Sequence, residues 1–126
     1  MRKVKVKICG LKRAQDIECV NRLLPDYIGF VFAKTKREVT EQQAAQLKAM
    51  LNPQIKAVGV FVNAEIDKIV RLAECRTIDI IQLHGDEDAA YCERLRLQTE
   101  LPIIKAVRVK DAGSFENLQA YPCDYL

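Results

Sequence analysis

The sequence predicts an α/β protein in which parallel strands are joined by crossover helices. Short runs rich in Val, Ile and Phe alternate with longer segments whose apolar residues repeat at the helical period. Two of the expected strands, "YIGFVFA" and "AVGVFVN", carry Gly29 and Gly59 at equivalent points. Internal similarity of this kind is typical of a fold that repeats one strand–helix unit.

Five strands and five intervening helices are expected, and a sixth strand begins near Cys123. The strands are expected over residues 3–9, 27–32, 56–62, 78–84 and 103–109. The helices are expected over residues 13–24, 40–51, 65–74, 87–98 and 114–120. Thr40 and Gln43 fit a capping box, and Asn63 and Asp86 are candidate caps for the third and fourth helices.

Two architectures use such units, the open doubly wound sheet and the closed barrel of eight strands. A dinucleotide-binding doubly wound sheet needs a glycine-rich loop after its first strand, whereas "CGLKRAQD" contains one glycine. The barrel is therefore favoured. Such barrels usually need about 250 residues, and this chain has 126. We therefore expect residues 1–126 to form a single domain, an incomplete (βα)8 barrel of the TIM-barrel type with about five βα units and the start of strand six.

The bulk composition is that of an ordinary soluble domain, with 49% apolar and 29% charged residues. The net charge of +3 is spread along the chain, and the basic runs "RKVKVK" and "KTKR" lack interleaved aromatic residues. This pattern argues against nucleic-acid binding.

No apolar run approaches the roughly 20 residues of a membrane helix, and the first residues do not resemble a signal peptide. A cytoplasmic protein without membrane contact is expected.

The five cysteines predict reduced thiols and no metal site. Their number is odd, no Cys-x-x-Cys pair occurs, and the chain has a single histidine. Cys19, Cys75 and Cys92 fall in helical patterns, so we expect them to be small core residues. Cys9 differs because it ends a strand and precedes a glycine.

The first expected strand places Cys9 where barrel enzymes carry their reactive groups, at a carboxyl end. Lys7 and Cys9 share one strand face, since side chains alternate. A charged Lys7 would favour the thiolate of Cys9. Gly10 would let the chain turn sharply and leave the thiol uncovered. The alternative interpretation is that Cys9 is a buried apolar cysteine.

Two other strand ends carry candidate binding groups. Gln82 and His84 share one face of the fourth strand, and Gly85 follows His84 as Gly10 follows Cys9. Arg37 in the "KTKR" loop could bind a carboxylate or phosphate through its planar guanidinium group. The alternatives are a structural histidine and a solvated basic loop.

Five ordered motifs resemble phosphoribosylanthranilate isomerase of tryptophan biosynthesis: "VKICGLK", "DYIGFVFAKTKREVT", "AVGVFVN", "IIQLHGDE" and "PIIKAVRV". The resemblance implies a (βα)8 barrel that acts on a small-molecule substrate. The reaction would be the Amadori rearrangement of N-(5'-phosphoribosyl)anthranilate to 1-(2-carboxyphenylamino)-1-deoxyribulose 5-phosphate, without a metal or an organic cofactor.

The resemblance also implies roles for individual residues. Cys9 would be the general base that takes the proton from C2 of the ribose, Arg37 would contact the anthranilate carboxylate, and His84 would line the same pocket. From their own positions on and after the strands, and not from the resemblance, Lys7, Gly10 and Gln82 are expected to support them. An aspartate that closes strand six would be the general acid.

The chain departs from this pattern at its far end. Asp124 falls at the beginning of the expected sixth strand, so the acid's role is not transferred to it. The acid and the phosphate-binding strands seven and eight are expected beyond "CDYL". Two other interpretations stay open: a non-enzymatic half-barrel that forms homo-oligomers through exposed sheet edges, and another phosphate-using barrel enzyme.

Overall fold

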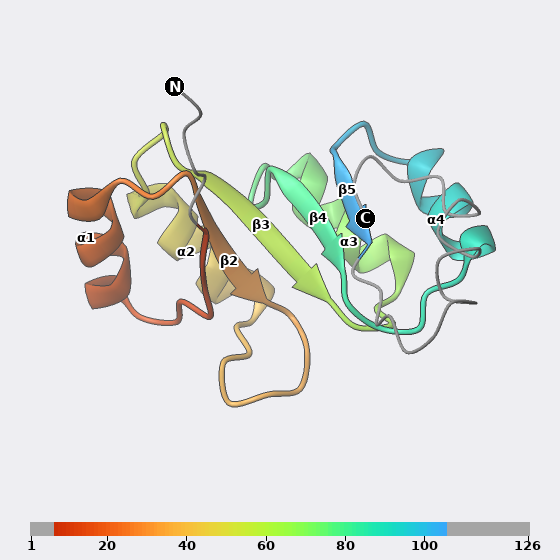
Figure 1. Cartoon of the computed structure of the whole chain (residues 1–126), viewed down its shortest axis with the longest axis horizontal. Coiled ribbons are helices and arrows are strands. Elements are labelled where there is room, and N and C mark those ends of the chain that lie inside the picture. Colours follow the sequence, from red (N-terminus) through yellow and green to blue (C-terminus); the bar gives the residue numbers. More distant parts are fainter. Residues whose placement is uncertain (1–6, 106–126) are drawn as a thin grey trace, which may run out of the picture.

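The computed structural model describes residues 7–105, which form a curved parallel sheet with four helices (Figure 1). The strands are β1 (Lys7–Cys9), β2 (Tyr27–Val31), β3 (Lys56–Phe61), β4 (Ile80–Leu83) and β5 (Ile103–Lys105). The helices between them are α1 (Ala14–Leu23), α2 (Glu41–Met50), α3 (Ile66–Glu74) and α4 (Ala89–Arg96). The expected strand–helix alternation is confirmed over this part of the chain.

The strands lie side by side in sequence order, β1-β2-β3-β4-β5, and every neighbouring pair is parallel. The register runs from Cys9 to Gly29, on to Val58 and then to Ile80. A doubly wound sheet reverses its strand order at a switch point, whereas a barrel does not. The strand order therefore agrees with the barrel prediction.

All four helices cover the same face of the sheet. One core cluster contains buried residues from each helix, and it includes Ile17, Leu47, Ile69 and Leu95. The same cluster contains alternate strand residues, including Ile28, Phe30, Ala57, Phe61, Ile81, Leu83 and Ile103. In Figure 1, α2 and α3 lie behind the sheet, and α1 and α4 flank its two ends. Helices on one face only are typical of a barrel wall.

The helix starts confirm one predicted cap and correct two. Thr40 and Gln43 form the reciprocal capping box at α2. The predicted caps Asn63 and Asp86 are wrong, because Asp88 caps α4 through the Tyr91 amide and α3 begins after Glu65 without a side-chain cap. The Asn63 Oδ1 atom instead accepts a hydrogen bond from the Asp86 amide.

Two of the cysteine predictions are also wrong. Cys92 is buried as expected, but Cys19 and Cys75 are exposed. In α1 the buried positions are Ile17 and Val20, so Cys19 lies off the apolar stripe of its helix. The predicted helix over 114–120, the strand near Cys123 and residues 3–6 and 106–109 of the outer strands lie outside the described residues.

Gly59 provides a test of the packing around β3 on the face of the sheet that the helices cover. It lies in register with Phe30 and Ile81, and an added Cβ would lie 2.9 Å from side-chain atoms of both Ile78 and Phe61. We expect Gly59→Ala to lower the free energy of unfolding by about 1–3 kcal/mol through overpacking, measured by urea denaturation. The control is Val62→Ile, which adds a methyl group at an exposed residue. It should change the free energy of unfolding by less than about 0.5 kcal/mol. Unchanged stability of Gly59→Ala would contradict this packing.

Candidate functional site at the carboxyl edge of the sheet

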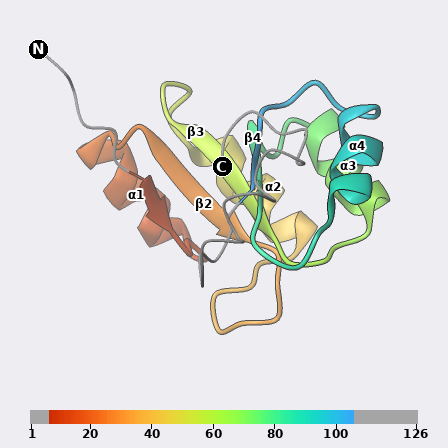
Figure 2. The same ribbon diagram turned by 45° about the vertical axis from the view of Figure 1, so that its right-hand side comes forward.

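Parallel strands bring all their carboxyl ends to one edge of the sheet. The loop that follows β2 extends beyond this edge, next to the ends of β2 and β3 (Figure 2). The segments that follow β1, β3 and β4 also start there. Residues far apart in the sequence therefore lie along one edge of the sheet, as the sequence predicted for a barrel.

The turn after β1 brings Gly10 and Arg37 together. Gly10 has φ +83°, and its amide donates a hydrogen bond of 2.9 Å to the carbonyl of Gly29. The side chain of Arg37 lies directly over Gly10: an added Cβ there would collide with Arg37 Cδ and lie 3.2 Å from its Nε. Glycine is needed here for both the backbone conformation and the close approach.

Cys9 is the residue immediately before this turn. Its backbone ends β1 in register with Gly29, and the side chains of Lys7 and Cys9 lie outside the described part of the structure. Because Gly10 follows Cys9 directly, the Arg37 side chain lies over the chain one residue beyond the candidate base. The loop after β2 therefore approaches the backbone turn that follows β1.

Two hydrogen bonds hold the loop that carries Arg37. The Lys12 ammonium donates a hydrogen bond of 2.8 Å to the Lys36 carbonyl, which joins the loop after β1 to the loop after β2. The Arg37 amide donates to the Thr35 hydroxyl at 3.1 Å. Arg37 is exposed, so its guanidinium group is available to a ligand carboxylate or phosphate.

Gln82 and His84 lie at the end of β4. Gln82 is half-buried and in register with Val60 and Ile104, on the face opposite to the helices. His84 is exposed, and its amide donates a hydrogen bond of 2.8 Å to the Phe61 carbonyl. The structure thus places His84 at the same edge as Arg37.

Sequence reasoning missed a buried ion pair beside His84. The Lys105 ammonium lies 2.9 Å from the Glu87 carboxylate, and the two side chains are 3% and 0% exposed. Glu87 also accepts hydrogen bonds from the amides of Asn63 at 2.7 Å and Gly85 at 2.9 Å. The sequence feature that could have indicated this pair is a lysine within the apolar run "PIIKAV". A lysine in such a run is expected to be buried, and a buried lysine needs a partner of opposite charge.

The charge state of Glu87 follows from these contacts. Burial would raise the pKa of the carboxyl group, but the hydrogen bonds from Lys105 and from the Asn63 amide outweigh burial and hold the pKa below its usual value. Nearby, burial raises the pKa of Tyr91 to about 12. Glu87 is therefore ionised and Tyr91 neutral near pH 7.

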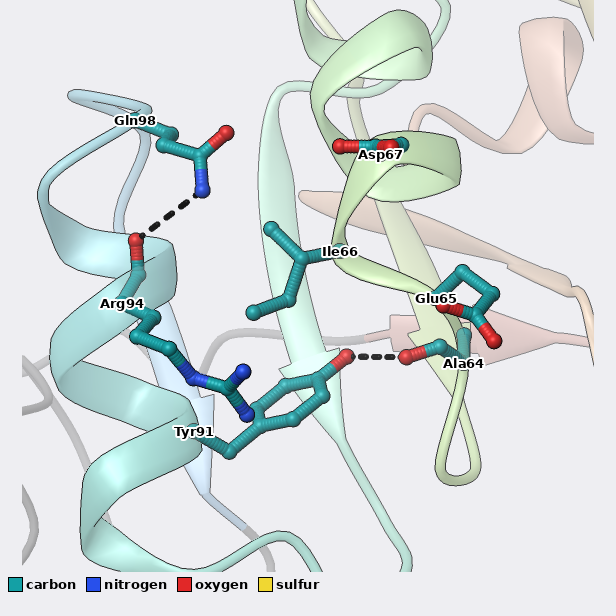
Figure 3. A pocket seen from close by; sticks show the side chains of 7 residues that line it. All are labelled: Ala64, Glu65, Ile66, Asp67, Tyr91, Arg94 and Gln98. Carbon is teal, nitrogen blue, oxygen red and sulfur yellow. Dashed lines mark hydrogen bonds between the residues drawn. The ribbon is translucent and has the colours of Figure 1, made fainter.

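A surface groove of about 420 Å³ lies between the start of α3 and α4 (Figure 3). The Tyr91 hydroxyl donates a hydrogen bond of 2.6 Å to the Ala64 carbonyl across it. The groove is lined by Ala64, Glu65, Ile66, Asp67, Tyr91, Arg94 and Gln98. None of the site residues predicted from the sequence lines this groove.

Within residues 7–105, no group of three or more His, Cys, Asp or Glu side chains is arranged to hold a metal ion. In the same part of the chain, no helix has the length and apolar character needed to span a membrane.

Comparison with known proteins identifies the family. The family model for N-(5'-phosphoribosyl)anthranilate (PRA) isomerase matches residues 6–125. The chain belongs to the PRA isomerase family. It is 48% identical over 122 residues to the PRA isomerase of Lachnoclostridium phytofermentans, which covers 97% of this chain and 56% of the relative. It is 52% identical over 107 residues to that of Endomicrobium trichonymphae, covering 85% of this chain and 54% of the relative.

Solved structures of PRA isomerases share the fold. A monomeric form of the dimeric Thermotoga maritima enzyme superimposes with a TM-score of 0.81 at 34% identity, covering 95% of this chain and 63% of that one. A PRA isomerase in complex with reduced 1-(o-carboxyphenylamino)-1-deoxyribulose 5-phosphate gives 0.79 at 34% identity, covering 92% and 59%. The chain thus spans about half the length of the curated relatives that it matches and forms an incomplete barrel of their type.

The ionised Glu87 predicts how stability depends on pH. Because its pKa is lowered on folding from the usual 4.5, the pair stabilises the protein above that pH, and this contribution is lost as the pH falls through the lower folded pKa. We expect Glu87→Gln to lower the free energy of unfolding at pH 7 by about 3 kcal/mol or more, because it leaves Lys105 charged and buried. The loss should shrink towards acid pH.

Urea denaturation between acid and neutral pH measures this effect. The control is Glu41→Gln, which removes one partner of an exposed ion pair with Arg71 and should cost about 0–1 kcal/mol. Equal losses in the two variants at pH 7 would show that the Glu87–Lys105 pair contributes no more than a surface pair.

Proposed function

We propose that this chain forms the N-terminal part of an isomerase that converts N-(5'-phosphoribosyl)anthranilate into 1-(2-carboxyphenylamino)-1-deoxyribulose 5-phosphate in tryptophan biosynthesis. The observation that carries the proposal is the position of Arg37 over Gly10, one residue beyond Cys9, at the sheet edge that also holds His84. A carboxylate-binding group next to a candidate base suits a substrate with an anthranilate carboxylate. One structural neighbour binds a reduced form of the product named here.

The proposed reaction is proton transfer on the substrate itself. A general acid protonates the ribose ring oxygen, the ring C–O bond breaks, and the anilino nitrogen supplies the electron pair that forms the C1 Schiff base. The Cys9 thiolate then takes the proton from C2, the C–H electron pair forms a C1=C2 double bond, and the C=N π electrons return to the nitrogen. The resulting enolamine tautomerises to the ketose. These steps are acid–base chemistry, so the proposal assigns no metal and no organic cofactor.

Five of the six predicted site residues, all but Gly10, have a part in this scheme. Cys9 is the base, and a thiol whose usual pKa is about 8.5 needs only a modest shift to act near neutral pH. Lys7 is proposed to favour its thiolate. Arg37 binds the anthranilate carboxylate, His84 lines the pocket, and Gln82 supports it from the face of the sheet opposite to the helices.

The general acid and the phosphate site are not assigned to any residue of this chain. The family resemblance places both beyond the sequence "CDYL". We therefore propose that the 126 residues alone have little isomerase activity. A cytoplasmic location and self-association through sheet edges remain predictions.

A fusion protein tests the proposal. The chain is joined to the remaining C-terminal part of the Lachnoclostridium phytofermentans relative, and the loss of phosphoribosylanthranilate is followed by fluorescence. We expect the fusion to be active and the 126-residue chain to remain at background. In the fusion, Cys9→Ser should lower kcat by about 100-fold or more, the range for removal of a general base.

The matched control is Cys75→Ser, which changes an exposed free thiol outside the site and should leave kcat unchanged. Full activity of the Cys9→Ser fusion would rule out Cys9 as the base. Activity of the short chain well above background would show that it holds its own general acid.

A further inference from the structure

The buried Glu87–Lys105 pair joins three elements at the carboxyl edge. Lys105 ends β5, Glu87 lies between β4 and α4, and Asn63 follows β3. One carboxylate oxygen of Glu87, Oε1, accepts from the Lys105 ammonium and the Gly85 amide, both at 2.9 Å. The other, Oε2, accepts from the Asn63 amide at 2.7 Å. Both oxygens are needed as acceptors, which a carboxylate supplies and a carboxamide does not.

The same contacts hold the backbone of residues 84–86, which carries the His84 side chain. The amides of three consecutive residues have separate partners: His84 donates to the Phe61 carbonyl, Gly85 to Glu87, and Asp86 to Asn63 Oδ1. The Gly85 carbonyl accepts from the Lys105 ammonium at 2.7 Å. The side chain of His84 is exposed while its backbone is held on both sides.

We propose that Glu87, Lys105 and Asn63 are positioning residues that hold His84 in place for substrate binding. This inference rests on the function proposed above. A binding group on an immobilised backbone loses less conformational entropy when it meets its ligand, and small displacements of such groups weaken binding and catalysis. The three residues act through the 84–86 backbone and do not themselves touch the substrate.

Asn63 offers a test that leaves the buried ion pair intact. Its φ of +50° lies in the left-handed region, so Asn63→Gly is compatible with the fold and removes the acceptor of the Asp86 amide. Arg76→Gly is the matched control, because Arg76 is exposed and has φ +59° in the turn after α3. Glu87→Gln is the second variant and removes an acceptor at the centre of the network.

The experiment compares amide hydrogen exchange in the 126-residue chain and its variants. In Asn63→Gly we expect the Asp86 amide to exchange about tenfold faster relative to the amides of β3, the size expected for one lost hydrogen bond. The ring resonance of His84 can be followed without ambiguity, because it is the only histidine. We expect it to shift or broaden in Asn63→Gly and Glu87→Gln but not in Arg76→Gly.

The fusion protein provides the functional measurement. Asn63→Gly should raise KM for phosphoribosylanthranilate about tenfold with a smaller change in kcat, whereas Arg76→Gly should change neither. Wild-type exchange at Asp86 and an unmoved His84 resonance in Asn63→Gly would overturn the positioning role, and so would an unchanged KM. An inactive parent fusion would refute the proposed function, while the exchange measurement would still decide whether the network holds the His84 loop.

Discussion

The structure depends on the parallel register of strands that follow one another in sequence. Each strand pairs with the next, and the register joins Cys9, Gly29, Val58 and Ile80 across four strands. With all helices on one face, this register directs every strand's carboxyl end to the same edge. The candidate base, the arginine loop and the histidine share that edge because of this arrangement alone.

The two ends of this edge are held together differently. At β1 and β2 the contacts are made by exposed side chains: Arg37 lies over the half-buried Gly10, and Lys12 donates to the Lys36 carbonyl. At β3, β4 and β5 a buried carboxylate joins three elements. An exposed arginine keeps freedom to meet a ligand, whereas the backbone under His84 is fixed before any ligand arrives. This difference is consistent with the roles proposed above for Arg37 as a carboxylate-binding group and for His84 as a residue that lines the substrate site.

The sequence was sufficient to predict what depends on periodicity. Strand order, parallel pairing and the placement of Cys9 and the Arg37 loop at carboxyl ends of strands follow from apolar runs and from strand ends. The buried pair was not predicted because its partners are 18 residues apart, and a lysine in an apolar run does not indicate which carboxylate it contacts.

Local competition between polar groups explains the other failures. Asn63, Asp86 and Asp88 are all capable of capping a helix, and only the fold decides that Asp88 caps α4 while Asn63 binds the Asp86 amide. The helical pattern around Cys19 predicts a core residue. The buried face of α1 carries Ile17 and Val20, however, and Cys19 lies outside that face and is exposed.

We infer that the substrate binds at the carboxyl edge of the sheet and not in the groove between α3 and α4. Amide chemical-shift mapping tests it directly, with reduced 1-(o-carboxyphenylamino)-1-deoxyribulose 5-phosphate added to the ¹⁵N-labelled fusion protein. We expect the largest shifts at Gly10, Arg37 and His84. Shifts concentrated at Ala64, Tyr91 and Gln98 in the groove, with none at Gly10 or His84, would contradict it.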